Sequence, residues 1–209
     1  MDDWQRADFE ALDAAWLRAG GRSETEPQQS RAYLERPRGH SKTCDLAVMA
    51  LWALAFAQRP ISGAAAAGDR DQARLLRDAI ERIVRANPWL AETLEIQNYR
   101  VLNPRTGSQL EILAADHATA YGHLLDFIVI DEMTNWPTGG DKLWQALAST
   151  IAKRRHCVAV IISNAGVGQG SSWQWDVRET CREAAAWYSS RLDGPCASWI
   201  TPQLLDEQQ

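Results

Sequence analysis

Residues 36–43 have the types and spacing of a loop that binds phosphate. They read Arg36-Pro37-Arg38-Gly39-His40-Ser41-Lys42-Thr43. A short segment, 31–35, leads into them, and an apolar run, 44–57, follows. In a strand, tight loop and helix of this kind, backbone N–H groups and the helix dipole attract phosphate oxygens. Lys42 would bring a positive charge to the β- and γ-phosphates, and the hydroxyl of Thr43 would hold Mg²⁺.

The loop departs from the pattern G-x-x-x-x-G-K-[ST], because Arg36 and Ser41 stand where glycine is expected. Taken alone, it is also compatible with an ordinary basic turn that caps a helix. The phosphate-loop interpretation assigns nucleotide binding to Pro37, Gly39, His40, Ser41, Lys42 and Thr43. Before the loop strand, Gln28 and Gln29 are candidate adenine contacts, although a solvated loop is the favoured interpretation there.

Two adjacent acids, Asp131 and Glu132, end a continuous apolar run, 127–130. Such a run is typical of a central parallel strand. An acid at the carboxyl end of that strand would lie in the crevice where open α/β sheets bind ligands. We expect Asp131 to hold the Mg²⁺ shell and Glu132 to be the general base for the attacking water. A strand end with solvated acids is the alternative, but the lysine loop and the acid pair together favour a nucleoside triphosphatase.

A third strand end carries small polar groups. Ser163 and Asn164 follow the apolar run 157–162. If this strand ends beside the other two, these side chains could sense the γ-phosphate. A simple turn is the alternative, and the position favours the sensor.

The elements that must position these residues alternate between helix and strand, which predicts an α/β fold with a mostly parallel sheet. The predicted helices cover 2–19, 43–58, 69–86, 141–153 and 173–188. The predicted strands cover 31–35, 61–67, 94–102, 109–114, 124–131 and 157–162, with a last strand within 189–199, broken at Gly194-Pro195. The segments 94–102 and 109–114 should pair antiparallel at a sheet edge. Helix 2–19 is amphipathic, and its inner face holds Phe9, Leu12, Trp16 and Ala19.

The composition limits the possible partners. The 209 residues suit one α/β domain or slightly more, and 45% apolar residues suffice for a core. A net charge of −5 argues against a surface dedicated to coating DNA, although a local basic patch is compatible with it. Four cysteines without a C-x-x-C pair are expected to be reduced, mostly buried thiols. The longest apolar run, 46–57, is too short to span a bilayer, and no signal peptide opens the chain, so no membrane is expected.

Four motifs, in order, resemble the N-terminal ATPase domain of DNA-packaging terminase large subunits of tailed bacteriophages. They are PRGHSKT (37–43), GDRDQAR (68–74), ATAYGHLLDFIVIDEMTNWP (118–137) and IISNAG (161–166). The resemblance implies a P-loop NTPase fold of the ASCE type, with one strand between the loop strand and the acid-pair strand and with helices flanking the sheet. It divides the chain into an N-terminal helix with its lead-in loop (1–30), the ATPase domain (31–200) and the start of a linker to an absent nuclease domain (201–209).

The same resemblance implies a MgATP-dependent enzyme. Lys42, Thr43, Asp131 and Glu132 match the family's roles, and Ser163-Asn164 match its motif that couples hydrolysis to movement. A loop arginine is usual there, which makes Arg36 or Arg38 a candidate catalytic residue in cis. Arg100 and Arg105, on the expected edge strands, are candidates for an arginine that acts on a neighbouring subunit.

The implied function is a motor that drives double-stranded DNA into a viral procapsid. The implied partners are DNA, a portal protein, a small terminase subunit and further copies in a homo-oligomeric ring, in the cytoplasm of an infected host cell. No nuclease activity is expected, because the chain stops where the linker should start. The alternatives are a catalytically weak nucleotide-binding assembly module and a helicase-like ATPase.

Overall fold

The computed structural model describes residues 1–115, 124–154, 156–166 and 170–201. Residues 118–123 of the third motif, 167–169 of the loop expected after Gly166, and almost all of the predicted linker 201–209 lie outside these ranges. No described helix is both long and apolar enough to cross a lipid bilayer.

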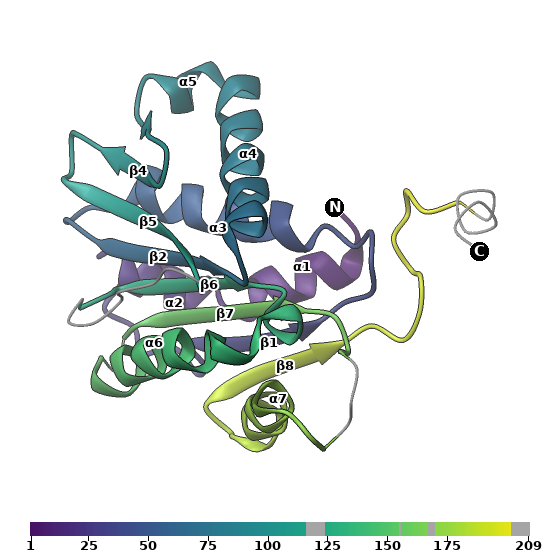
Figure 1. Cartoon of the computed structure of the whole chain (residues 1–209). Coiled ribbons are helices and arrows are strands. Elements are labelled where there is room, and N and C mark those ends of the chain that lie inside the picture. Colours follow the sequence, from purple (N-terminus) through teal and green to yellow (C-terminus); the bar gives the residue numbers. More distant parts are fainter. Residues whose placement is uncertain (116–123, 155, 167–169, 202–209) are drawn as a thin grey trace.

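Within the described residues, an eight-stranded sheet has the order β3-β4-β5-β2-β6-β7-β1-β8 (Figure 1). Its strands are β1 (Arg31–Glu35), β2 (Ser62–Ala67), β3 (Glu95–Ile96), β4 (Arg100–Asn103), β5 (Ser108–Ala114), β6 (Phe127–Asp131), β7 (Val158–Ser163) and β8 (Trp187–Arg191). The pairs from β5 to β8 are parallel, and β3 and β4 pair antiparallel at one edge. The predicted α/β fold, with a mostly parallel sheet and an antiparallel edge, is confirmed.

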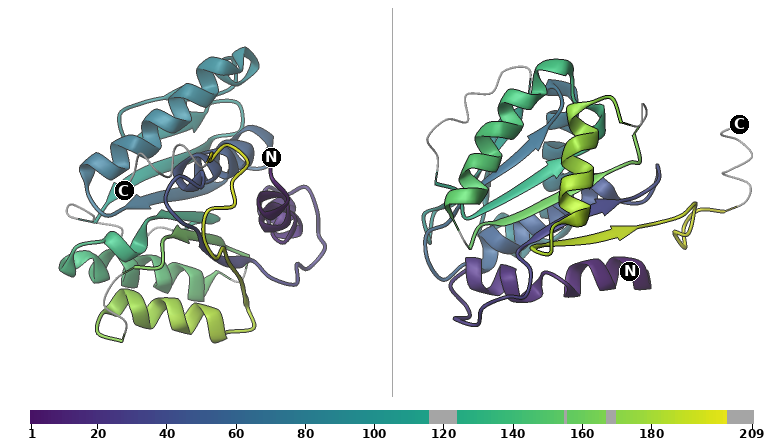
Figure 2. Two further views of the ribbon diagram at one scale, coloured as in Figure 1. Left: turned by 90° about the vertical axis from the view of Figure 1, so that its right-hand side faces the viewer. Right: turned by 90° about the horizontal axis from the view of Figure 1, so that it is seen from below.

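Helices cover both faces of the sheet (Figure 2). They are α1 (Asp3–Glu10), α2 (Asp13–Ala19), α3 (Lys42–Phe56), α4 (Arg70–Ala86), α5 (Pro88–Ala91), α6 (Asp141–Lys153) and α7 (Trp173–Glu183). Alternate strand residues point to opposite faces. In β6, Phe127 and Val129 pack with α1 to α4, whereas Ile128 and Ile130 pack with α6 and α7. The strand is therefore buried on both sides, which explains its unbroken apolar run.

The strand β7 lies between β1 and β6, as the resemblance implied. In the register of the sheet, Glu35 of β1 is opposite Ser163 of β7, and Asp131 of β6 is opposite Ile162. The carboxyl ends of the three strands thus meet at one edge. This arrangement brings the loop 36–43, the acid pair and the Ser163-Asn164 turn together.

Three predicted elements are wrong in extent. The expected helix 2–19 is interrupted between α1 and α2, so that α1 presents polar side chains to the loop 36–43 while α2 buries apolar ones. The expected strand 94–102 is itself a hairpin, since β3 and β4 pair through a turn in which the Gln97 N–H donates to the Arg100 carbonyl. The expected helix 173–188 ends at Glu183, and 187–191 form β8, because pairing with β1 satisfies that backbone.

The expectation for the cysteines needs correction. All four cysteines are free thiols, but only Cys157 and Cys181 are buried, whereas Cys44 and Cys196 are exposed. Asp141 lies in the first turn of α6, and Gly140 occupies the cap position.

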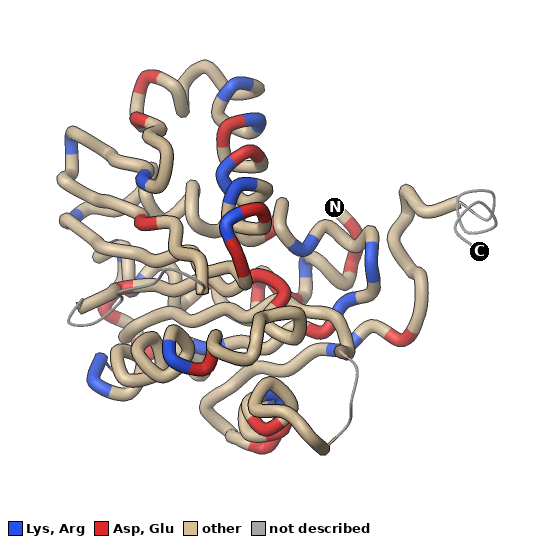
Figure 3. The backbone as a smooth tube through the Cα atoms, in the orientation of Figure 1, with Lys and Arg blue, Asp and Glu red and all other residues tan. Residues whose placement is uncertain are grey.

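Charged residues of both signs lie along the length of α4 (Figure 3). Arginines pair with acids one turn away, as in Arg77–Glu81 at 2.9 Å and Arg85–Glu81 at 2.6 Å. Such partly exposed pairs, one turn apart, are typical of a solvated helix face. They do not make a continuous basic stripe of the kind that follows a DNA backbone.

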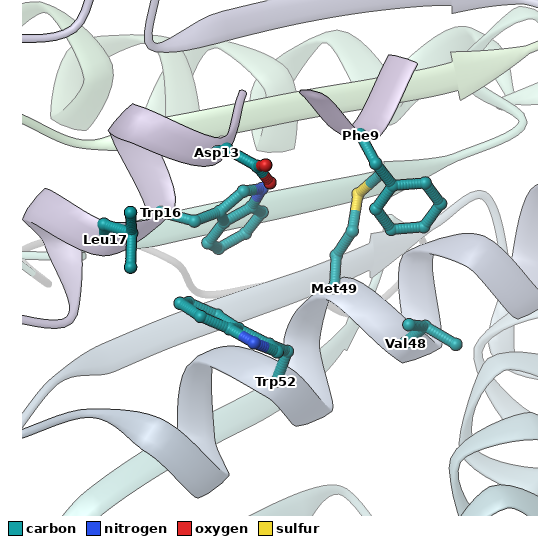
Figure 4. A pocket seen from close by; sticks show the side chains of 7 residues that line it. All are labelled: Phe9, Asp13, Trp16, Leu17, Val48, Met49 and Trp52. Atoms are coloured by element: carbon teal, nitrogen blue, oxygen red, sulfur yellow. The ribbon is translucent and has the colours of Figure 1, made fainter. Parts of the chain in front are cut away.

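A pocket of about 330 Å³ lies between α1–α2 and α3 (Figure 4). Its walls are largely apolar, with the rings of Phe9, Trp16 and Trp52, and Asp13 also lines it. No residue of the loop 36–43 lines it. It is therefore separate from the polar side chains that meet at the carboxyl edge of the sheet.

Candidate active site

The hydroxyl of Thr43 and the carboxylate of Asp131 are in direct contact. Thr43 lies in the first turn of α3, and Asp131 is the last residue of β6. Thr43 Oγ1 donates a hydrogen bond to Asp131 Oδ2 at 2.6 Å. Asp131 is buried, and its second oxygen, Oδ1, has no hydrogen-bond partner. Burial raises the pKa of this carboxyl to about 6, and Glu132 adds to the rise, while Thr43 and Lys42 oppose it.

This pair fits Mg²⁺. A hydroxyl and a carboxylate are the oxygen ligands that Mg²⁺ takes, and the unpartnered Oδ1 of Asp131 is a buried acceptor for which a cation would compensate. Among the described residues, no group of three or more His, Cys, Asp and Glu side chains could hold a metal ion alone. Mg²⁺ is usually bound by one or two carboxylates together with substrate phosphates, so the smaller ligand set is the expected one.

The amino group of Lys42 lies at the centre of the loop. It donates to the carbonyl oxygen of Pro37 at 2.9 Å and to that of Arg36 at 3.4 Å, and it lies 3.0 Å from Glu132 Oε1. Lys42 is buried, so these three acceptors replace water as its partners. A phosphate group entering the loop would compete with these acceptors for the N–H donors of Lys42.

Glu132 is held on its other oxygen by two amides. Oε2 accepts hydrogen bonds from Asn164 Nδ2 at 2.8 Å and from Asn135 Nδ2 at 2.9 Å. Thr134 fixes the orientation of Asn164 by donating to its Oδ1 at 2.7 Å. Ser163 Oγ in turn accepts from the Thr134 N–H at 3.1 Å. The acid pair and the Ser163-Asn164 turn therefore form one hydrogen-bonded unit.

Thr134 and Asn135 were not predicted as site residues. Both lie in the short 3₁₀ turn Met133–Asn135 that follows the acid pair. Their position in the sequence could have indicated this role, because polar residues directly after Glu132 stay close to the end of β6. Glu132 itself has a left-handed backbone, with φ 50°, and this tight turn brings Asn135 back to its carboxylate.

Arg36 does not face the centre of the loop. Its side chain is completely buried, and its Nη1 and Nη2 donate to Asp45 at 2.6 Å and to Asp8 at 2.9 Å. Releasing it would leave two buried carboxylates without their cation, which is costly. These two ion pairs argue against the prediction that Arg36 acts on a phosphate in cis. Arg38 is exposed, and its role stays a prediction.

The side chain of His40 points away from the loop centre towards the segment 196–199. Its Nε2 accepts hydrogen bonds from the N–H groups of Cys196 at 3.0 Å and Ala197 at 3.3 Å. The indole of Trp199 donates to the carbonyl of Gly39 at 2.9 Å. Side-chain contact of His40 with a nucleotide is thus not supported, while its backbone remains part of the loop.

The remaining predicted residues lie apart from the carboxyl edge of the sheet, where the loop 36–43 and the acid pair meet. Arg100 pairs with Glu111 at 3.1 Å on the outer strands. Arg105 lies in the turn before β5, at the end of the sheet opposite the loop 36–43. Gln29 also lies at that opposite end, before β1, where it donates to the carbonyl of Trp187 at 3.1 Å. This position excludes the adenine contact for Gln29 within one subunit.

A pocket of about 640 Å³ lies along the same edge as the acid pair. Its walls come from the start of the phosphate loop, from the Asn164 turn and from the end of β8. It is open to solvent, and Asn135 and Asn164 both line it. The two amides that hold Glu132 can therefore be reached from a space large enough for a ligand.

Comparison with known proteins identifies the family and the fold of the chain. The family "Terminase large subunit, ATPase domain" matches residues 14–182. None of the curated proteins matches the chain. Among solved structures, the HK97 bacteriophage large terminase superposes with a TM-score of 0.72 and 16% identity, covering 97% of this chain and 41% of that one.

Two further structures have the same fold. The ATPase domain of the Thermus phage P74-26 large terminase gives a TM-score of 0.56 at 24% identity, over 80% of this chain and 71% of that one. The large terminase of a thermophilic bacteriophage, in complex with ADP, gives a TM-score of 0.68 at 9% identity. This match covers 96% of this chain and 49% of that one. The chain thus spans less than half of the HK97 large terminase and of the ADP-bound one. Since the family covers most of the chain and the sheet is that of a P-loop NTPase of the ASCE type, the chain belongs to the ATPase domains of terminase large subunits.

Proposed function

We propose that this chain hydrolyses MgATP and that hydrolysis powers the movement of double-stranded DNA into a viral procapsid. One observation carries the proposal: the lysine and threonine of the phosphate loop contact the two consecutive acids at the end of β6, Glu132 at 3.0 Å and Asp131 at 2.6 Å. A basic turn that merely capped a helix would not need both contacts. The similar large terminase from a thermophilic bacteriophage contains ADP, which supports nucleotide binding by this chain.

Each side chain has a distinct task in this proposal. Lys42 neutralises charge on the β- and γ-phosphates, and the backbone N–H groups of the loop hold their oxygens. Thr43 and Asp131 hold Mg²⁺, which would neutralise charge that develops on the phosphates. Glu132 orients the attacking water and takes its proton, once its carboxylate has left Lys42 and the two asparagines.

The Ser163-Asn164 turn suits a coupling role because it contacts Glu132 and lines the open pocket of about 640 Å³. A ligand or neighbouring segment in that pocket can compete for Asn164 and so change the position of the general base. We propose DNA, a portal protein, a small terminase subunit and further copies in a ring as partners, in the cytoplasm of an infected host cell. Membership of the terminase ATPase family supports these proposed partners.

Steady-state ATP hydrolysis with and without double-stranded DNA tests the proposal. Wild type should release phosphate faster with DNA, and Glu132→Gln should abolish release under both conditions. Hydrolysis that persists in Glu132→Gln would remove the assigned base. Binding of ATP without any turnover in wild type would favour the second candidate, a nucleotide-binding assembly module. The observation in favour of that candidate is the threefold restraint on Glu132 by Lys42, Asn135 and Asn164.

A further inference from the structure

The proposed mechanism makes no use of a buried polar network beside the phosphate loop. Within it, Arg36 bridges Asp8 of α1 and Asp45 of α3. Gln5 of α1 lies with its Nε2 3.1 Å from each carboxylate oxygen of Asp45. All four side chains are buried. Buried charged groups are retained only when they are paired and hydrogen-bonded, and here most of the pairing partners of Asp45 come from outside its own helix.

Ser41 connects this network to the backbone of the loop. Its Oγ donates to Asp45 Oδ1 at 2.8 Å, and its carbonyl accepts from the Asp45 N–H at 2.9 Å. Ser41 has φ 55° and ψ 22°, a left-handed conformation that residues with a Cβ rarely adopt. It occupies the position at which the standard loop has glycine, which reaches this conformation without a steric cost.

We propose that Asp45 is a positioning residue for the phosphate loop, and that α1 belongs to the nucleotide site through Gln5 and Asp8. Asp45 holds Ser41 in the left-handed conformation from which the N–H groups of Lys42 and Thr43 face a phosphate. Gln5 fixes the Asp45 carboxylate directly, and Asp8 does so through Arg36. The inference rests on the proposed function, because it takes the loop to bind nucleotide.

The first test compares two substitutions at position 41 by the affinity for MgADP. Ser41→Ala removes the hydroxyl and keeps the Cβ, so the binding-competent loop is populated less and the Kd should rise by roughly 5- to 30-fold. Ser41→Gly removes the hydroxyl and the Cβ together and should bind about as tightly as wild type. The proposal would be overturned if Ser41→Ala bound MgADP as tightly as wild type. It would also be overturned if Ser41→Ala and Ser41→Gly lost affinity equally.

A second test uses Asp45→Asn, with Asp126→Asn as a matched control. Asp126 is equally buried and pairs with Arg59 and Arg154, each at 3.0 Å, but it precedes β6 at the opposite end of the sheet. Both variants should lower the melting temperature, and only Asp45→Asn should weaken MgADP binding. Adding Ser41→Gly to Asp45→Asn should restore affinity without restoring the melting temperature. Unrestored affinity in a folded double variant would count against the positioning role.

Hydrogen exchange of residues 36–45 without nucleotide separates this inference from the proposed function. Ser41→Ala, which leaves the Arg36 pairs intact, should exchange faster there than wild type, and Asp126→Asn should not. If wild type fails to bind MgADP, the proposed function is wrong, and the exchange result alone decides the role of Asp45. Unchanged exchange in Ser41→Ala would overturn that role.

Discussion

Asn164 donates a hydrogen bond from its Nδ2 to Oε2 of Glu132 over 2.8 Å. The same oxygen accepts from Asn135, and the other carboxylate oxygen lies beside Lys42. A general base needs a free lone pair directed at the water that it deprotonates. If Glu132 is the general base, as proposed, its carboxylate must leave these partners before it can take the proton of the water.

Asn135→Ala should raise basal, DNA-independent ATP turnover by a few-fold. The substitution removes one of the hydrogen bonds that restrain Glu132 and leaves Asn164 in place. Phosphate release without DNA measures the effect, and Asn98→Ala, in the exposed turn between β3 and β4, is the control. A fall in turnover with unchanged nucleotide affinity would show that Asn135 assists Glu132 instead of restraining it.

Lys42→Ala and Glu132→Gln should separate binding from turnover. Lys42→Ala should abolish tight MgATP binding, because it removes the positive charge that lies among the loop carbonyls of Arg36 and Pro37. Glu132→Gln should keep binding and lose turnover. Titration calorimetry measures the affinity of both, and an equal loss of affinity would contradict the assigned roles.

Asp131 should make the metal-free protein less stable as the pH rises. Its pKa is raised from 3.8 to about 6, so its contribution to folding is fully present below about pH 4 and is lost as the pH rises through 6. The shift corresponds to about 3 kcal/mol. Thermal unfolding of metal-free wild type and Asp131→Asn should therefore diverge from pH 5 to pH 7.5, with the variant relatively more stable at the higher pH.

The same pKa predicts weaker Mg²⁺ binding in acid. Binding requires the carboxylate form, so the affinity for Mg²⁺ in the presence of ADP should fall about tenfold per unit below pH 6. Magnesium titrations between pH 5 and pH 8 measure this fall. A flat profile would argue that Asp131 is not a ligand.

Arg36→Ala and Arg38→Ala should have opposite consequences. Arg36→Ala leaves Asp8 and Asp45 buried without a cation, and it should cost about 3–5 kcal/mol of unfolding free energy. Arg38→Ala should leave stability unchanged. If Arg38 supplies charge to the transition state, its loss should lower kcat by about 10³-fold or more. Chemical denaturation measures the change in stability, and single-turnover hydrolysis measures the change in rate. A normal kcat in Arg38→Ala would indicate that a neighbouring subunit supplies the catalytic arginine.

Rings assembled from two variants test whether Arg100 acts on the active site of a neighbouring subunit. Subunits with Arg100→Ala are combined with subunits with Glu132→Gln. A role in trans predicts restored hydrolysis wherever an intact Glu132 site meets an intact Arg100. Because Arg100 pairs with Glu111, Glu111→Gln should also alter the rate. A mixture no more active than its components would exclude the role of Arg100 in trans.

The sequence predicted the parts of the site that carry local signals. Lys42 and Thr43 end a loop between a strand and an apolar helix, and Asp131 ends an apolar run that only a doubly covered strand explains. The edge hairpin followed from the turn residues after β4. These features depend on neighbours in the chain, which a single sequence displays.

The features that escaped prediction depend on distant partners. Gln5 and Asp8 looked like the solvated face of an amphipathic helix, but they are buried against residues of α3 and the loop. The last strand was predicted within 189–199, but β8 already begins at Trp187, where it pairs with β1. Arg36 resembled a catalytic arginine by type and place, and its partner Asp8 could not be read from the loop.

The phosphate loop is also where the first and last described parts of the chain meet. The Ser198 N–H donates to Asp2 at 2.8 Å, and the N–H groups of Cys196 and Ala197 donate to His40. Contacts between segments so far apart in sequence form late in folding, because they close the longest loops. During synthesis, a chain whose residues near 199 are still inside the ribosome lacks these contacts. The loop 36–43 is therefore expected to reach its final conformation only after residues 196–199 have left the ribosome.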